Sequence, residues 1–131
     1  MFADRFRKLI ETADRAAVED FYTDHALLDA NVPSWRFQRK GLEEIAAQYT
    51  QWFRNGLPKI EDLKELPASF GAVIEMDQRE PNPSGGELYS RQLHLLFAEG
   101  EKIARHVMYC TGPWDAETVE KQRTEAPMVE L

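Results

Sequence analysis

The stretch ELYSRQLHLLFAEGEKIARHVMYCT, residues 87–111, alternates apolar and polar side chains on both sides of Ala98-Glu-Gly-Glu101. Alternation with a period of two is typical of a β-strand, and a glycine between two such runs marks a hairpin turn. We therefore predict two long antiparallel strands, residues 87–97 and 102–111, joined by a four-residue turn.

Outward from this hairpin, the hydrophobic period changes from two to that of a helix. Gly41 begins the clearest helix, whose apolar residues share one face and which Asn55-Gly56 ends. Asp14 is a plausible N-cap for an earlier helix. In chain order, the patterns predict helices at 2–13 and 15–22, a strand at 26–32, a polar loop at 35–40, the helix from Gly41, strands at 58–66 and 70–79, a turn-rich loop at 80–86, the hairpin, and a short helix at 116–124.

This order predicts an α+β fold, with helices packed on one face of a curved antiparallel sheet. The 131 residues match the usual length of one domain, so we expect a single domain over 1–131. Residues 125–131 are expected to be a loosely ordered tail.

The charge balance argues against several classes of partner. The chain has 16 basic and 23 acidic residues, whereas nucleic-acid binding needs clustered Lys and Arg and anionic membranes attract basic segments. One cysteine excludes an internal disulfide framework and a multi-cysteine zinc site. No apolar run approaches the roughly 20 residues of a membrane-spanning helix, and the N-terminus MFADRFRKLIETAD has no signal-peptide core. We expect a small, acidic, cytoplasmic protein.

Three segments together resemble a known superfamily. They are Phe21-Tyr-Thr-Asp-His-Ala26, Gly41-Leu-Glu-Glu-Ile45, and a hairpin of the form Leu93-His-Leu-Leu-Phe97 followed by Tyr109. In this order they resemble nuclear transport factor 2, ketosteroid isomerase and the SnoaL-like polyketide cyclases, over nearly the whole chain. The resemblance implies a cone, in which a bent sheet wraps three helices and leaves a pocket at the open end. Enzymes and non-enzymes share this fold, so the resemblance argues fold more strongly than function.

The steroid isomerases of this superfamily use a tyrosine of the first helix, an aspartate base of the first strand and a protonated aspartate late in the sheet. The resemblance places these on Phe6, Ala30 and Leu93, so none of the three is present. Asp29 lies one residue from the base position and, without a slip, faces the other side of the strand. We therefore reject steroid-isomerase chemistry in its known form.

The resemblance also implies that Phe97 faces the pocket. Alternate residues of the same strand then face it too, namely Leu95, Leu93, Arg91 and Tyr89. The four-residue turn pairs Phe97 with Lys102 and puts His106 opposite Leu93, on the same face as Met108 and Cys110. His94 would face the other side, and a turn one residue different would leave His106 on the surface.

His106, Arg91 and Asp29 are the candidate catalytic residues. Imidazole titrates nearest neutral pH, so His106 is the first candidate for general acid or base; a structural or interface histidine is the alternative. Arg91 could bind an anion or stabilise developing charge, or could instead pair with Glu75 or Asp77. Asp29 could act as a base or orient His106, or could be an exposed strand charge.

The expected substrate pocket is lined by aromatic and apolar side chains. Tyr49 and Trp52 lie on an apolar helix face, where core packing is the alternative, and Trp35 could form a lid in its loop. The full set is Tyr22, Trp35, Tyr49, Trp52, Tyr89, Leu93, Met108 and Cys110. His25, His94 and His106 do not share a metal-ligand spacing, and no glycine-rich phosphate loop is present, so we predict no metal and no cofactor.

Two functional hypotheses follow. The first is a SnoaL-like enzyme of bacterial type that acts on a small organic or secondary metabolite by cofactor-free acid/base chemistry: isomerisation, cyclisation, elimination or hydrolysis. The second is a non-catalytic ligand-binding or assembly protein of the same fold. In either case we expect a homodimer through the outer sheet face, where Gln92, His94 and Leu96 would lie, and no nucleic-acid or membrane partner.

Overall fold

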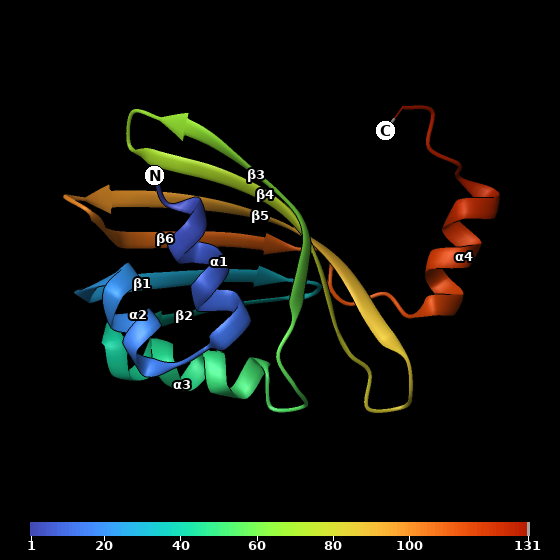
Figure 1. Ribbon diagram of the computed structural model, residues 1–131, viewed down its shortest axis with the longest axis horizontal. Helices are drawn as coiled ribbons and strands as arrows, with labels where there is room; N and C mark the ends of the chain where they lie inside the picture. The colour runs from blue at the N-terminus through green and yellow to red at the C-terminus, as the bar shows by residue number, and fades with distance from the viewer. Residues whose placement is uncertain (131) are drawn as a thin grey trace.

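A computed structural model of the chain describes residues 1–130 (Figure 1). Its elements, in order, are α1 (Ala3–Thr12), α2 (Arg15–Phe21), β1 (Tyr22–Val32), β2 (Trp35–Lys40), α3 (Gly41–Trp52), β3 (Lys59–Ala68), β4 (Gly71–Pro81), β5 (Glu87–Glu99), β6 (Lys102–Cys110) and α4 (Ala116–Glu125). The first three helices lie on one side of a curved sheet (Figure 1). The predicted α+β class is confirmed.

The strands form one sheet in the order β2-β1-β6-β5-β4-β3. Neighbouring strands are antiparallel except β1 and β6, which are parallel. The prediction of a polar loop at 35–40 is wrong, because this segment is β2 and pairs with β1 across the Pro33-Ser34 turn. None of the β2 residues is buried, so the segment lacks the apolar alternation that would have indicated a strand.

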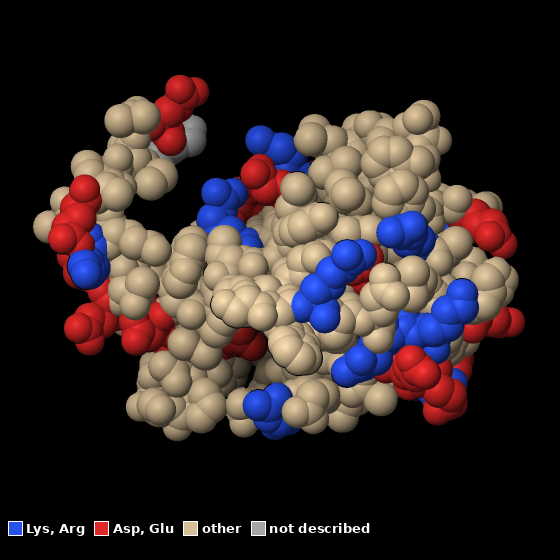
Figure 2. All heavy atoms as spheres, turned by 180° about the vertical axis from the view of Figure 1, so that it is seen from behind, with Lys and Arg blue, Asp and Glu red and all other residues tan. Residues whose placement is uncertain are grey.

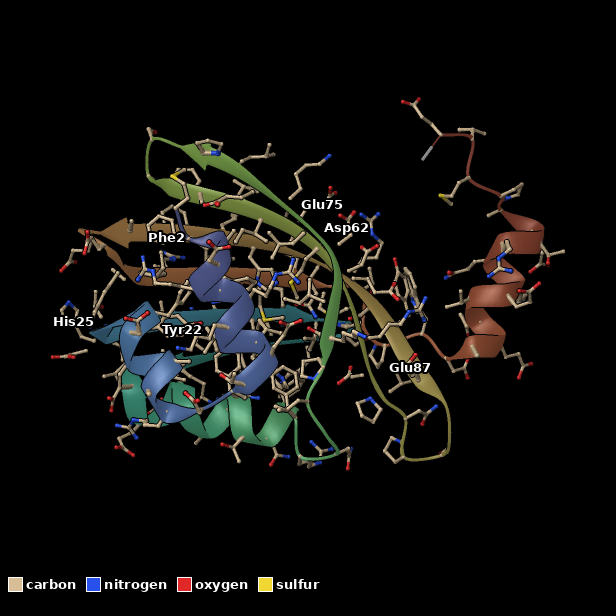
Figure 3. All side chains as sticks on the ribbon, in the orientation of Figure 1. Phe2, Tyr22, His25, Asp62, Glu75 and Glu87 are labelled. Atoms are coloured by element: carbon tan, nitrogen blue, oxygen red, sulfur yellow. The ribbon has the colours of Figure 1, made fainter. Side chains whose placement is uncertain are left out.

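The helices cover the inner face of the sheet through a buried apolar core. Asp14 caps α2 as predicted, with the Ala17 amide donating to its carboxylate at 2.8 Å. Phe6 of α1 and Ile45 of α3 are completely buried in this core. Tyr22, at the start of β1, lies between the helices and the sheet (Figure 3).

The β5–β6 hairpin has a different register from the predicted one. Its turn consists of Gly100 and Glu101, and a β-bulge with Ala104 as the extra residue follows, so Phe97 pairs with Arg105 and His106 pairs with Leu96. A bulge shifts the pairing without a clear sequence signal. The inward residues of β5 are therefore Ser90, Gln92, His94 and Leu96. The predicted inward set of Tyr89, Arg91, Leu93, Leu95 and Phe97 lies on the other face.

His106 nevertheless faces inward as predicted. The prediction paired it with Leu93 and took Leu93 as inward, whereas it pairs with Leu96, which is the inward residue. Leu95, by contrast, faces outward, beside Val107 of β6. His94 and His106 consequently share the inner face, and the prediction that they face opposite sides is wrong.

The short C-terminal helix predicted at 116–124 is present as α4, which projects from the end of the sheet (Figure 1). Asp115 caps it by accepting a hydrogen bond from the Thr118 amide at 2.8 Å, and none of its residues is buried. Of the tail predicted at 125–131, Leu131 lies outside the described residues. Within residues 1–130, no helix combines the length and apolar character needed to cross a membrane.

Candidate functional site

A cavity of about 430 Å³ lies between the helices and the inner face of the sheet. This volume is within the range of small-molecule sites, which are mostly apolar with a few placed polar groups. Its apolar wall consists of Ile10, Val32, Pro33, Tyr49, Trp52, Phe53, Met108 and Pro113. Its polar wall comes from the inward residues of β4, β5 and β6, namely Gln78, Glu80, Ser90, Gln92, His94 and Cys110.

Gln78 lines the cavity and lies opposite Ser90 in the sheet. The residue is only 4% exposed. Its amide forms no hydrogen bond with another described side chain, and its polar atoms are open to the cavity rather than sealed in the core without a partner. The amide of Gln78 is therefore available to a ligand.

Glu80 supplies the cavity's charge. It is the one residue with a charged side chain among the described residues that line the cavity. Its carboxylate has no ion pair or hydrogen bond to another described side chain, and burial raises the pKa of the carboxyl above its ordinary value. Glu80 was predicted to lie in a loop, but it belongs to β4 and continues the inward alternation of Ile74, Met76 and Gln78.

A continuous chain of buried hydrogen bonds runs beneath the cavity. The Tyr49 hydroxyl lies 2.8 Å from the Tyr22 hydroxyl, which lies 2.7 Å from His106 Nδ1. His106 Nε2 lies 2.7 Å from His94 Nδ1, and His94 Nε2 lies 2.9 Å from Gln92 Oε1. The Gln92 amide nitrogen then donates to Ser90 Oγ at 3.3 Å.

Burial keeps this chain uncharged at neutral pH. It lowers the pKa of His106 to about 3, and burial together with the neighbouring His106 lowers the pKa of His94 well below its ordinary value. Burial also raises the pKa of both Tyr22 and Tyr49. Phe6 packs its ring edge to face against His94, with centroids 4.7 Å apart.

The structure does not bring the three candidate catalytic residues together. His106 is completely buried below the cavity and reaches its wall through His94 on one side and through Tyr22 and Tyr49 on the other. Arg91 lies on the outer face of the sheet and pairs with Asp77 at 2.8 Å and Glu75 at 3.5 Å, which was its alternative interpretation. Asp29 also lies on the outer face, beside Val107, but is 1% exposed rather than solvated.

The Asp29 carboxylate is held by a bidentate contact with Arg36 at 2.9 and 2.6 Å. That contact lowers the pKa of Asp29. Seen from behind, basic side chains cross a largely uncharged surface (Figure 2). Neither arginine lines the cavity, so the pairs formed by Arg36 and Arg91 are part of the outer surface.

Of the eight residues predicted to line the pocket, some line the cavity and others lie away from it. Tyr49, Trp52, Met108 and Cys110 line the cavity, and Tyr22 lies buried behind its wall. Tyr89 and Leu93 face away from it because the register of β5 differs from the predicted one, and Trp35 is 69% exposed on the edge strand β2 rather than in a lid. Gln78, Glu80, Gln92 and His94 also line the cavity and were not among the predicted pocket residues.

The fold recurs in solved structures that share little sequence with this chain. A nuclear transport factor 2-like protein from Anabaena variabilis matches with a TM-score of 0.65 at 15% identity, covering 84% of each chain. A phenazine biosynthesis-related protein from Pseudomonas aeruginosa matches with a TM-score of 0.63 at 15% identity, covering 98% of this chain and 83% of its own. A protein from Sinorhizobium meliloti named as a polyketide cyclase matches with a TM-score of 0.61 at 12% identity, covering 82% and 93%.

No family model matches the sequence, and no curated protein does. Structural matches at these identities establish the fold alone. The chain has the nuclear transport factor 2-like fold that the sequence predicted.

Proposed function

We propose that this chain is a SnoaL-like small-molecule enzyme, which binds a small organic metabolite in the cavity and transfers protons on it with its own side chains. The observation that carries the proposal is the Glu80 carboxylate, unpaired among the described residues and partly buried in a mostly apolar cavity. The polyketide cyclase and the phenazine biosynthesis-related protein support the metabolite class, by analogy of fold.

Glu80 is the general base of this proposal. A carboxylate whose pKa is raised by burial holds a proton more strongly and is a better base near neutral pH. It would remove a proton from a carbon next to a ligand carbonyl. The C–H bond breaks, the proton moves to a Glu80 oxygen, and the electron pair moves onto the carbonyl oxygen.

Gln78 and Gln92 would stabilise the oxygen that gains this charge. Both amides line the cavity, and amide N–H groups already in place at a developing oxyanion stabilise it without reorganisation. The Gln92 amide donates one hydrogen to Ser90 Oγ and would offer the second to the ligand oxygen. His106 would act behind this wall, through His94, whereas Arg91 and Asp29 would serve the outer face.

The cavity should also reject anions. No Lys or Arg is among the described residues that line it, and Glu80 would repel a carboxylate. The ligand is therefore proposed to be uncharged where it contacts the polar wall.

Hydrogen exchange into a simple ketone tests this function. Tetralone is incubated in deuterium oxide with the whole chain, and mass spectrometry follows the gain of deuterium next to the carbonyl. We expect exchange faster than in buffer and a loss of roughly 10²–10⁴-fold in Glu80→Gln, the usual size of a general-base contribution. Glu75→Gln, on the outer face (Figure 3), is the matched control and should exchange like the wild type. Equal rates in Glu80→Gln and wild type would reject the role of Glu80.

Assembly through the outer sheet face is a second candidate function. Leu93 of β5 pairs with Tyr109 of β6, and both side chains lie on this face, where they are 39% and 51% exposed. Apolar side chains exposed together are typical of a subunit interface. If the chain is a homodimer through this face, Leu93→Lys should shift sedimentation equilibrium to the monomer, and a monomeric wild type rejects the candidate.

A further inference from the structure

The buried hydrogen-bond chain begins and ends at the same cavity. Tyr49 at one end and Gln92 with Ser90 at the other line the cavity, and His94 touches it. Tyr22 and His106, the middle members, are completely buried and do not line it. Any ordering of hydrogens along the chain therefore reaches the ligand from two sides.

The hydrogens along this chain must all point in the same direction. A neutral imidazole has one donor and one acceptor nitrogen, and a hydroxyl shared by two partners donates to one and accepts from the other. Four bonds link Tyr49, Tyr22, His106, His94 and Gln92 in series. Two arrangements satisfy all four: every donor points toward Gln92, or every donor points toward Tyr49.

The Gln92 amide selects the first arrangement. Its oxygen faces His94 Nε2 at 2.9 Å and its nitrogen faces Ser90 Oγ at 3.3 Å. Because an amide oxygen only accepts, His94 carries its hydrogen on Nε2, and its bare Nδ1 accepts from His106 Nε2. His106 Nδ1 in turn accepts from the Tyr22 hydroxyl, whose oxygen accepts from Tyr49.

We infer that Tyr22, His106 and His94 are positioning residues that fix the hydrogen-bonding polarity of the cavity, so that Gln92 presents a donor to the ligand and Tyr49 an acceptor. The inference rests on the proposed function, since it concerns the ligand of the same cavity. Tyr49 uses its hydrogen inside the protein and offers only a lone pair outward. The cavity then favours a ligand with a carbonyl oxygen toward Gln92 and a hydroxyl toward Tyr49.

The positions of the imidazole hydrogens test the inference without any ligand. Nitrogen-15 NMR of the full chain at neutral pH distinguishes a protonated from a bare imidazole nitrogen. We expect a hydrogen on Nε2 and a bare Nδ1 in both His94 and His106. His25, exposed at the edge of the molecule (Figure 3), is the internal reference for a solvent-exposed imidazole. A hydrogen on Nδ1 of either buried histidine overturns the inference.

Ligand selectivity tests the same inference through a residue that does not touch the cavity. Tyr22→Phe removes the oxygen that accepts from Tyr49, so the Tyr49 hydroxyl becomes free to donate into the cavity. The preference for naphthol, which donates a hydroxyl hydrogen, over tetralone, which only accepts, should fall by about fivefold, the usual worth of one hydrogen bond. Tyr109→Phe, on the outer face, removes an exposed hydroxyl and should leave the preference unchanged.

The outcomes separate this inference from the proposed function. Binding of both probes with the same preference in wild type and Tyr22→Phe overturns the inference and leaves the pocket as a binding site. Binding of neither probe to the wild type counts against the proposed function, and the nitrogen spectrum then decides the direction of the chain on its own.

Discussion

His94 Nδ1 and His106 Nε2 lie 2.7 Å apart in the core, and both imidazoles are neutral. A single hydrogen fills the space between the two nitrogens. Protonating either ring would add a second hydrogen to this pair, and the resulting charge would be buried, with no carboxylate of the described residues paired to it.

Stability should consequently fall as the pH drops below that of an ordinary histidine. The folded-state pKa of His106 is about 3 and that of His94 is also far below the ordinary value of 6.5, so the unfolded chain binds more protons than the folded one between these values. Stability is then full above pH 7 and decreases on acidification by up to about 1.4 kcal/mol per pH unit for each histidine. Urea unfolding at pH 7.5 and 5.5 should differ by roughly 2–3 kcal/mol.

His94→Gln should reduce this pH difference by about half, because one of the two buried imidazoles is gone. His25→Gln, which removes an exposed imidazole, should leave it intact. A free energy of unfolding that is the same at both pH values in the wild type would mean that the pair is already protonated or is open to water.

Asp29 should contribute to the free energy of unfolding and not to the exchange of deuterium into the ketone. Its carboxylate is 1% exposed and depends on Arg36, whose own side chain is 62% exposed and therefore partly screened. Asp29→Asn keeps the shape but weakens the charged hydrogen bonds, and we expect a loss of about 1–2 kcal/mol in urea unfolding with wild-type deuterium exchange into tetralone. A folded Asp29→Asn protein that has lost exchange would return this residue to the catalytic machinery.

The sequence was sufficient for the helices and for the strands other than β2, and it was insufficient for the faces of β5. Gly41 and Asp14 mark helix starts because caps and hydrophobic period are local features. In the run Leu95-Leu96-Phe97, apolar side chains lie on both faces of the strand, so alternation alone does not show which face is buried. The bulge at Ala104 then moved the pairing, and the contact between His94 and His106 depends on both. No local pattern contains that information.

The rate of exchange should rise with pH as Glu80 loses its proton. A general base acts only in its deprotonated form, and burial raises the pKa of this carboxyl, so the inflection should lie above the ordinary 4.5. The pH–rate profile of the wild type measures this inflection, over the pH values at which the protein remains folded. In Glu80→Gln this limb should vanish, and an inflection that persists there would belong to another group.

Gln92 should have two separable roles, because it accepts from His94 and donates toward the cavity. In Gln92→Glu the carboxylate still accepts from His94 Nε2 but offers no hydrogen to the ligand, so we expect a folded protein whose exchange is slower by roughly 10²–10³-fold, the usual effect of losing one oxyanion donor. In Gln92→Leu the His94 N–H is left unpaired in the core, which should cost about 1–3 kcal/mol in urea unfolding as well. Met76→Leu changes an inward neighbour on β4 and should do neither. If Gln92→Glu exchanges as fast as the wild type, Gln92 serves the buried chain alone, and Gln78 becomes the donor to the ligand oxygen.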